Sequence, residues 1–324
     1  DTVLNNVTID FINLSAVTVH TITTPIAPGA AFYVDMGLLG ALTTFNGSVV
    51  VTAKRADNSA GKVVASSMEL FLSGTGVFAF EGVESGATEV FMPSYLCGRW
   101  SQNSSYAVQN TSLTTATSVT VTYTATADSG GGTYSQTLPI GPGAKASFLA
   151  CNAAPLNTYG AAVVTSTTTP VVAIGKVYGG GLSTAFLGVA MGSEVMGLPY
   201  VRWATDANYN AGLGQRTYIT IQNVGTPLVE DERIDVEYYD YAGTLAATHS
   251  IVLGVGGLPT GAKTNSNASS AGLLEFGYYG SIYGGAVIIR GPAGSELAAV
   301  ARVASYVVAT GLTVAEDYNS QPIQ

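Results

Sequence analysis

Few residues in this chain have the types and the spacing that catalysis requires. Its two histidines, His20 and His249, lie in segments that alternate like strands and are far apart in the sequence. No Ser or Cys stands near them in the sharp turn that presents a nucleophile in hydrolases. The glycine clusters at 130–132 and 179–181 lack the Lys-Ser or Lys-Thr pair of a phosphate-binding loop, so they indicate turns. The sequence therefore predicts that the chain is not an enzyme and binds no cofactor.

One passage has the spacing of a calcium-binding loop. Asp206, Asn208 and Asn210 occupy its first, third and fifth positions, where oxygen ligands would coordinate Ca²⁺. The sixth position is Ala211, where such loops have Gly, and the twelfth position is not Glu. The acidic passage 230–240 offers more carboxylates, but solvated loop charges that protect a sheet edge explain it more simply. We predict no metal site and keep the first three residues as the only calcium candidates.

The chain has two cysteines, Cys97 and Cys151. Two are too few for a disulfide scaffold or for a cysteine-based zinc site. A bridge between them would close a loop of roughly 55 residues and would stabilise the fold by about 4 kcal/mol in chain-entropy terms. We predict this disulfide, and two buried free thiols are the alternative.

The composition argues against nucleic acid and membrane surfaces as partners. Charged residues make up 10% of the 324 residues, and the net charge is -9 with 12 Lys+Arg and no basic run. The counterion release that drives binding to nucleic acid is therefore missing, and anionic membranes are disfavoured for the same reason. Solubility must come from hydroxyl and amide groups, or partners must cover much of the surface.

One segment, 297–315, approaches the length of a membrane span. Arg302 lies in its middle, and the segment aligns with 170–190, where Lys176 takes the place of Arg302. Two strands joined by a turn explain both segments, so we predict no membrane span. The chain opens at Asp1 without Met or an apolar leader, as a mature secreted chain or a fragment would.

The clearest feature of the sequence is an internal repeat. In each copy a Pro and an Arg-Trp pair precede an alternating segment that ends in Gln-Asn, followed by further segments in a fixed order. The matching passages are 91–110 with 197–223, "SVTVTYTA" (118–125) with "RIDVEYYD" (233–240), "IGPGAK" (140–145) with "PTGAK" (259–263), and "YGAAVVTS" (159–166) with "YGGAVIIR" (283–290).

The beginning of the chain repeats only the later part of this order. Its matching passages are "NVTIDFIN" (6–13), "IAPGAAFYVDM" (26–36), "FNGSVVVTAK" (45–54) and "GKVVASSMELFL" (61–72). We therefore divide the chain into unit one (1–88), unit two (89–196) and unit three (197–324, with the tail 313–324).

The repeated segments indicate an all-β fold. They are four to eight residues long, rich in Val, Ile, Thr, Tyr and Phe, and separated by Gly, Pro, Asn and Ser. In "RIDVEYYD" Ile234, Val236 and Tyr238 fall on one face, as in a half-buried antiparallel strand. Units of this size built from such strands predict three tandem antiparallel β-sandwiches of the immunoglobulin-like (Ig-like) type.

The Gln-Asn strand, the "VTVTY" and "VEYYD" strands, the "GPGAK" and "TGAK" turns and the "YGGAVI" strand resemble a known style of repeat. They are similar to the tandem β-sandwich repeats of extracellular bacterial surface proteins, notably those of filamentous Chloroflexota-type bacteria. The resemblance covers units two and three and part of unit one. It implies a secreted or surface-displayed protein and carries over no catalytic residue.

Unit one lacks the entry strands that begin the other two units. Its sheets should then expose unpaired N–H and C=O groups and part of an apolar core. The tail 311–324 stands where a linker would lead into a further sandwich. We therefore predict that the tail of one subunit adds as a strand to the incomplete unit of the next, a heterologous contact that propagates as a filament. The residues expected at this interface are Val314, Tyr318 and Ile323 of the tail and Val7, Ile9 and Phe11 of unit one.

Two alternatives remain for the missing strands: unit one is a reduced sandwich covered by its own loops, or chain upstream has been lost. The function predicted from these features is that of an extracellular structural protein, a subunit of a surface filament or layer that polymerises with copies of itself. The alternative is a carbohydrate-binding or adhesive module that binds surface glycans through the tyrosines of unit three, which are Tyr238, Tyr239, Tyr241, Tyr278, Tyr279 and Tyr283.

Overall fold

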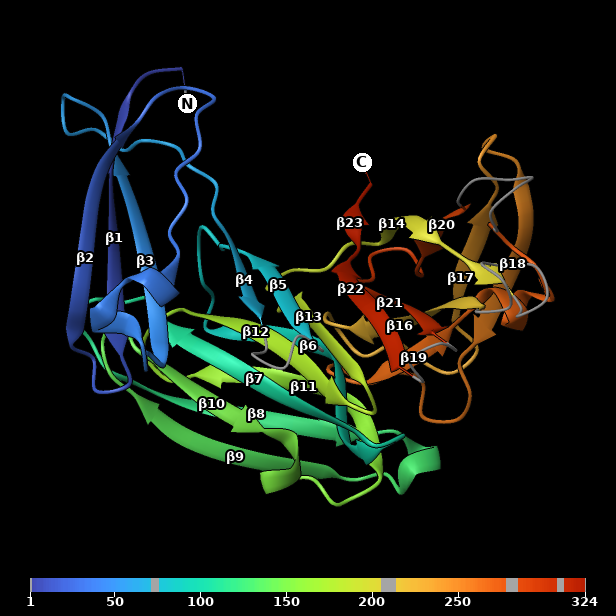
Figure 1. Ribbon diagram of the computed structural model, residues 1–324. Coiled ribbons are helices and arrows are strands. Elements are labelled where there is room, and N and C mark those ends of the chain that lie inside the picture. Colours follow the sequence, from blue (N-terminus) through green and yellow to red (C-terminus); the bar gives the residue numbers. More distant parts are fainter. Residues whose placement is uncertain (1, 71–75, 205–213, 278–284, 308–311, 324) are drawn as a thin grey trace.

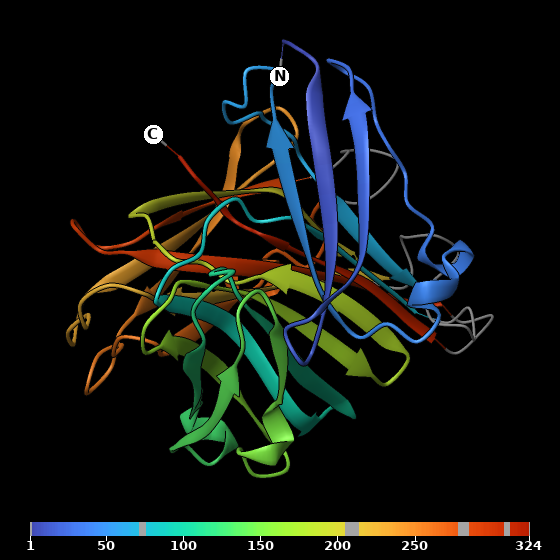
Figure 2. The ribbon, with the colours of Figure 1, turned by 90° about the vertical axis from the view of Figure 1, so that its left-hand side faces the viewer.

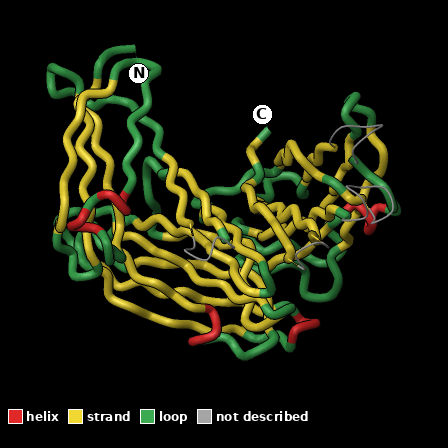
Figure 3. The backbone as a smooth tube through the Cα atoms, viewed as in Figure 1, coloured by secondary structure: helices red, strands yellow, loops and turns green. Residues whose placement is uncertain are grey.

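The computed structural model describes residues 2–70, 76–204, 214–277, 285–307 and 312–323 (Figure 1). These residues form strands, joined by loops and by single turns of 3₁₀ helix (Figure 3). All strand pairs are antiparallel, so the prediction of an all-β fold of antiparallel sheets is confirmed. Within the described residues no helix has the length and apolar character needed to cross a membrane.

Unit one contains a three-stranded sheet and a separate hairpin. The sheet has the order β2-β1-β3, and the hairpin pairs β4 with β5. Figures 1 and 2 show the sheet projecting from one end of unit two, with its free end near the N-terminus. The strands are β1 (Asn5–Asn13), β2 (Thr18–Ile26), β3 (Gly47–Lys54), β4 (Ser66–Leu70) and β5 (Val77–Glu81), and the helices between β2 and β3 are η1 (Met36–Leu38) and η2 (Gly40–Leu42).

Unit two is a sandwich-like structure around one core. One layer has the order β9-β8-β11-β6, the other has the order β10-β7-β12-β13, and β6 and β7 join them at a short hairpin. Its strands are β6 (Glu89–Arg99), β7 (Gln102–Asn110), β8 (Thr117–Ala125), β9 (Thr133–Ile140), β10 (Lys145–Leu149), β11 (Thr158–Ser166), β12 (Val171–Gly179) and β13 (Leu182–Leu187), with the helices η3 (Ala127–Ser129) and η4 (Ala150–Asn152).

Unit three repeats this arrangement, with its first strand divided into two and one short strand added at the end. One sheet has the order β18-β17-β20-β14-β23, and the other has β15-β16-β21-β22 with β19 also paired to β16. Its elements are β14 (Val195–Val201), β15 (Trp203–Ala204), β16 (Gln215–Asn223), β17 (Arg233–Tyr239), β18 (Leu245–Val252), β19 (Lys263–Ser266), η6 (Ala268–Ala271), β20 (Gly285–Arg290), β21 (Leu297–Val307), β22 (Leu312–Asn319) and β23 (Gln321–Pro322).

The strand pairing has the same register in each unit, and for β20 this register differs by one residue from the match of 159–166 with 283–290 that the sequence indicates. In the sheet of unit two Thr122 pairs with Val163, and in unit three Glu237 pairs with Ile288 at the matching place. The corresponding pair in unit one is Asp10 with Val50. The strands β1, β8 and β17 are therefore equivalent, as are β3, β11 and β20. Since a slip of one residue would turn every apolar side chain to the other face, this shared register explains why the repeat keeps its alternation.

Units two and three each have a buried core. The first combines tyrosines and small aliphatic residues from both layers of unit two, including Tyr95, Tyr106 and Tyr123. The second combines both sheets of unit three around Ile219, Ile221 and other aliphatic residues. Apolar side chains from facing layers that leave water together are what stabilise such a sandwich-like arrangement.

Candidate assembly interface

Unit one has two strands with an open edge. In unit two, β11 pairs with β8 on one side and β6 on the other, and β12 pairs with β13 and β7. Among the described residues the equivalent strand β3 pairs with β1 and, at its last residue only, bridges from Lys54 to Ala60, while β4 pairs with β5 alone. The places of β6 and β7 are therefore vacant in unit one. Unpaired edges of this kind present N–H and C=O groups to which another strand can add.

The core face of unit one is also open beside these edges. Val49 on β3 is 39% exposed, whereas its equivalent in unit two, Ala162, is fully buried. Val63, just before β4, is 38% exposed, whereas its equivalents Val171 and Leu297 are fully buried. More than half of the exposed large hydrophobic side chains in the described part of the chain lie in residues 1–88. Exposed apolar surface, where it is contiguous, is a common feature of contact sites.

The predicted acceptor residues Val7, Ile9 and Phe11 lie on this core face of β1. Val7 and Phe11 are buried, and Ile9 is half-buried. The ring of Phe11 packs edge-on against Phe45, with centroids 5.7 Å apart, and lies 5.9 Å from the ring of His20. The chain's own loop between β2 and β3 therefore covers part of the face. The uncovered part lies toward β3 and β4.

The predicted donor segment is paired within its own chain. Residues 312–319 do not form a linker, as the sequence suggested, but form β22, which pairs with β21 along its whole length. Val314 is 53% exposed, and the Tyr318 hydroxyl donates to the backbone oxygen of Tyr200. Ile323 is 42% exposed, and its N–H donates to the Val195 oxygen at 3.0 Å. The prediction of a linker was wrong because β22 is a strand by virtue of its pairing with β21, and the sequence of the tail alone does not show that pairing.

A tight joint connects unit two to unit three. Phe91, Val163 and Val189 of unit two pack against Val224 and Ala298 of unit three in one apolar cluster. The outer face of β11, which points away from the core of unit two, supplies Val163. This cluster buries apolar surface between the units and fixes their relative position.

The second part of this joint is a glycine turn that docks on the outer face of β11. A Cβ atom added to Gly261, whose φ is +81°, would lie 2.9 Å from Val163 Cγ2. The Gln222 amide then bridges the units, since its Nε2 donates to the Ala162 oxygen at 3.0 Å and to the Gly261 oxygen at 2.9 Å. The repeated Gln of the Gln-Asn strand is therefore a joint residue.

Unit one and unit two meet through the same elements. The turn at Gly143, whose φ is +67°, lies against Ile12 of unit one, where an added Cβ atom would be 2.6 Å from Ile12 Cδ1. Ser48 donates its hydroxyl to the Gly143 oxygen at 2.5 Å, and Gln109 donates to the same oxygen at 3.2 Å. Val50, the equivalent of Val163, packs against the core of unit two. This turn contacts Ile12 of β1 and Ser48 of β3, whereas the turn of the second joint contacts Val163 of β11, the equivalent of β3, so the two joints share the glycine turn but differ in where it docks.

The Asn of the Gln-Asn strand organises the loop beside each joint. Asn110 Nδ2 donates to the Thr115 oxygen at 2.7 Å, and Asn223 Nδ2 donates to the Thr226 and Leu258 oxygens at 2.9 Å. Both Asn side chains are fully buried. A buried amide that satisfies backbone groups in this way is costly to replace.

The glycine turns of units two and three are each followed by a lysine, Lys145 and Lys263. Lys263 lies 5.0 Å from the centre of the Tyr159 ring of unit two. Burial, with a smaller effect from the charge of Arg302, lowers the pKa of Lys263 to about 7. Burial likewise lowers the pKa of Lys145, the equivalent residue at the first joint. These lysines are titratable groups held in the joints.

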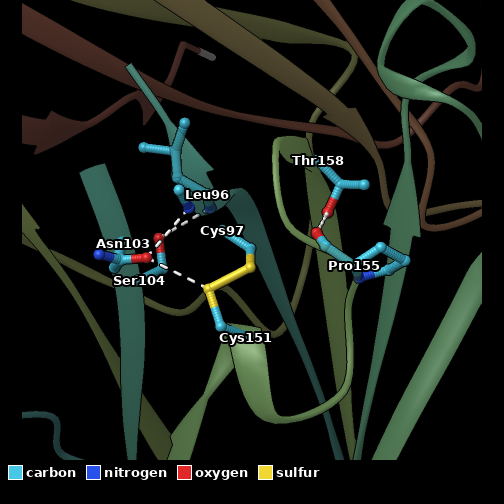
Figure 4. The surroundings of a disulfide bond; sticks show 8 residues. Leu96, Cys97, Asn103, Ser104, Cys151, Pro155 and Thr158 are labelled. Carbon is cyan, nitrogen blue, oxygen red and sulfur yellow. Dashed lines mark hydrogen bonds between the residues drawn. A yellow bond between two sulfur atoms is a disulfide. The ribbon is translucent and has the colours of Figure 1, made fainter. Parts of the chain in front are cut away.

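The two cysteines form a disulfide bond in unit two, with their Cα atoms 5.0 Å apart. The bond connects β6 of one layer to η4, which follows β10 of the other layer (Figure 4). Beside it the Leu96 N–H donates to Ser104 Oγ at 3.0 Å, so β6 and β7 are also held by a side chain at this corner. The disulfide therefore ties the two layers where the chain passes between them.

The remaining candidates for chemistry give no site. Asp206, Asn208 and Asn210 lie outside the described residues, and within those residues no cluster of His, Cys, Asp and Glu could hold a metal ion. His249 is partly buried, and its Nδ1 lies 2.9 Å from Ser266 Oγ in the strand β19. One hollow of the described surface is open to solvent and lined by residues that include Asp231, Arg233 and Arg290. The joint is the feature that recurs with a shared geometry, and the open strand edges distinguish unit one.

No protein-family model, no curated protein and no solved structure matches the chain.

Proposed function

We propose that this chain is an extracellular structural protein, a subunit that polymerises into a surface filament or layer. It comprises three tandem Ig-like β-sandwich units, of which unit one is completed by strand addition from a second copy in a head-to-tail arrangement. The disulfide of unit two is compatible with an oxidising, extracellular setting.

The observation that carries this proposal is the vacancy at β3 and β4. The register of unit one matches that of unit two, so the vacancy corresponds to two particular strands, β6 and β7, rather than to a general lack of order. Val49 and Val63 are exposed at the positions where those strands would cover them. An added pair of strands would satisfy both open edges and bury this apolar face.

Electron microscopy of the purified protein tests the proposal, beside a variant that ends at Asn319. This end point is chosen because β22 is part of the sheet of unit three, so a shorter chain would damage that unit directly. Filaments or layers in the intact sample are expected. Their loss in the shorter variant would identify residues 320–324 as part of the contact, and their persistence would place the donor strand elsewhere. Monomers of the intact chain at every concentration would contradict the proposal.

A second candidate function is glycan binding by an exposed aromatic surface. Tyr238 is buried, so it cannot stack on a sugar, but Trp100 is 61% exposed at the tip of the β6–β7 hairpin with a φ of +53°. Its ring lies 5.2 Å from that of Tyr159, and the Arg99 guanidinium lies 5.0 Å above it. Exposed aromatic rings beside polar groups suit pyranose stacking. Retention of the intact chain on a polysaccharide column, lost in Trp100→Ala, would favour this candidate.

A further inference from the structure

The same four-residue turn occurs three times in the chain. In each copy the fourth residue donates its N–H to the oxygen of the first: Ala30 to Ala27, Ala144 to Gly141, and Ala262 to Pro259. The third residue is Gly with a positive φ each time: +73° at Gly29, +67° at Gly143 and +81° at Gly261. A Gly at this position is what a type II turn requires. The three turns are therefore equivalent structures.

Two of these turns are docked and one is free. The turns at Gly143 and Gly261 lie against the outer face of the preceding unit, in contact with Ile12 and Val163 respectively. The turn at Gly29 is exposed, and a Cβ atom added there would meet no atom within 4 Å. Unit one thus carries the docking element of a joint without the surface that it docks on.

Unit three carries a surface equivalent to the one on which these turns dock. Ile288 on β20 occupies the place of Val163 on β11, since both pair with the same position of the neighbouring strand. It is half-buried. Unit three therefore carries the same kind of outer face as the face of unit two to which it is attached.

Ile323 completes this face. In unit two the bulky Phe91 forms the centre of the joint cluster, but the equivalent residue of unit three is Gly197. A Cβ atom on Gly197 would lie 2.9 Å from Ile323 Cδ1, so the Ile323 side chain fills the space that Phe91 fills in unit two. The apolar character of the joint face is preserved by a different residue.

Unit one also carries the apolar residue that such a face would receive. Ile174, the partner of Leu187 at the end of β13, lies two residues after Val172, and Ser66, the partner of Glu81 at the end of β5, lies two residues after Val64. Val171 and Leu297 pair with the matching residues Asn110 and Asn223, so Val172 is equivalent to Ala298. Val64 is therefore at the position of Ala298, the residue of unit three that is 2% exposed within the joint cluster. Val64 is fully exposed.

From these correspondences we infer that the outer face of unit three, formed by Ile288 and Ile323, binds unit one of a second copy through the Gly29 turn and Val64. The contact repeats the glycine turn and the apolar residue of the second joint but not its Gln bridge, because the strand that would carry that Gln is missing in unit one. This inference rests on the proposed function and adds a second contact between copies to the strand addition. Because the two surfaces differ and lie at opposite ends of the series of units, the contact is heterologous and adds one copy after another.

A disulfide trap tests the contact directly. Both native cysteines are in the Cys97–Cys151 bond, so the double variant Val64→Cys, Ile288→Cys introduces the sole free thiols. Under mild oxidation it should give a ladder of covalent oligomers on a non-reducing gel, whereas either single variant should give dimers at most. A double variant that cross-links no further than the single variants would overturn the inference.

A capping experiment separates the inference from the proposed function. Ile288→Lys and Val64→Lys should each abolish polymerisation, because each buries a charge in an apolar contact and two lysines cannot pair with each other. An equimolar mixture of the two should yield dimers only, through the two intact ends, as measured by light scattering. Val255→Lys, at an exposed site of unit three, is the matched control and should polymerise normally. Circular dichroism confirms that each variant is folded.

The outcomes are distinct. If the unaltered chain polymerises and Ile288→Lys, folded, does so equally well, the inferred contact is wrong and the proposed function stands. If the unaltered chain never polymerises, both are wrong. Loss of polymerisation in both variants together with dimers in the mixture supports the contact.

Discussion

At one strand position the three units differ in whether a tyrosine hydroxyl is present and in whether it forms a hydrogen bond. Phe11, Tyr123 and Tyr238 occupy equivalent places on β1, β8 and β17. The Tyr238 hydroxyl forms a hydrogen bond of 2.8 Å with Ser266 Oγ, whereas the buried Tyr123 hydroxyl has no hydrogen-bond partner within the described part of the chain. Burial raises the pKa of both tyrosines, which keeps them neutral.

Removing each hydroxyl should therefore have opposite effects. Tyr123→Phe should leave the free energy of unfolding unchanged or raise it by about 1 kcal/mol, because an unsatisfied buried group is lost. Tyr238→Phe should lower it by about 1 kcal/mol, because Ser266 loses its partner. Urea unfolding of the two variants measures both values. Equal destabilisation by both changes would mean that Tyr123 has a partner, such as a buried water molecule.

Lys263 makes the stability of the second joint depend on pH. Its pKa is about 7 in the folded chain against 10.5 for a free side chain, because burial disfavours the charged form. The folded state therefore binds fewer protons than the unfolded state between pH 7 and pH 10.5, and stability should rise with pH in this window.

The variant Lys263→Met should remove this dependence. We expect it to be more stable than the unaltered chain at pH 6.5 by about 1–2 kcal/mol, a value reduced from the full pKa shift because the side chain keeps some contact with water. The difference should shrink toward pH 10. Thermal unfolding at several pH values gives the comparison, and a difference that stays constant with pH would contradict the assignment.

At the scale of elements, a docked turn requires glycine both for its backbone conformation and because a side chain would meet the neighbouring unit. Gly261→Ala introduces a Cβ atom at positive φ and 2.9 Å from Val163 Cγ2, whereas Gly29→Ala introduces the same backbone strain with no neighbour within 4 Å. In the monomeric chain we expect Gly29→Ala to cost about 1 kcal/mol and Gly261→Ala about 1–2 kcal/mol more. Calorimetry of the two variants separates strain from contact. Equal costs would mean that the Val163 side chain moves aside freely.

The disulfide contributes at the corner between β6 and η4. Replacing both Cys97 and Cys151 by Ser should lower the stability of unit two by about 4 kcal/mol, since the bond closes a loop with a sequence separation of 54. The core of unit two should survive, because its buried tyrosines and aliphatic residues come from both layers. Comparison of unfolding with and without reductant checks this, and a cost below 1 kcal/mol would show that η4 is held by packing alone.

The sequence predicted the features that depend on neighbouring residues and missed those that depend on contacts between distant parts of the chain. Alternation is local, so "RIDVEYYD" predicted the strand β17 and its buried face. The vacancy in unit one was also predictable, because the order of repeated passages is visible without coordinates. The role of Gln222 was not, since its partner Ala162 lies in another unit, and the assignment of 312–319 failed because β22 is defined by its pairing with β21.

At the scale of the whole molecule, unit one differs from the other units in having little core of its own. Its buried apolar side chains are few, and one of them, Ile12, belongs to the core of unit two. A unit that exposes two strand edges and an apolar face should open more often than a closed sandwich. Its stability should therefore depend on assembly more than that of units two and three.

Hydrogen exchange measured by mass spectrometry tests this dependence. In the monomeric chain the amides of β3 and β4 should exchange quickly, whereas those of β8 and β11 should be protected by neighbours on both sides. In the assembled protein β3 and β4 should become protected to a level near that of their equivalents β11 and β12, because added strands occupy both open edges. The folded, non-polymerising variant Ile288→Lys provides the monomeric reference at the same concentration. If assembly protected the Gly29 turn but left β3 and β4 unchanged, copies would bind through the joint alone, and strand addition would have to be abandoned while the filament remained.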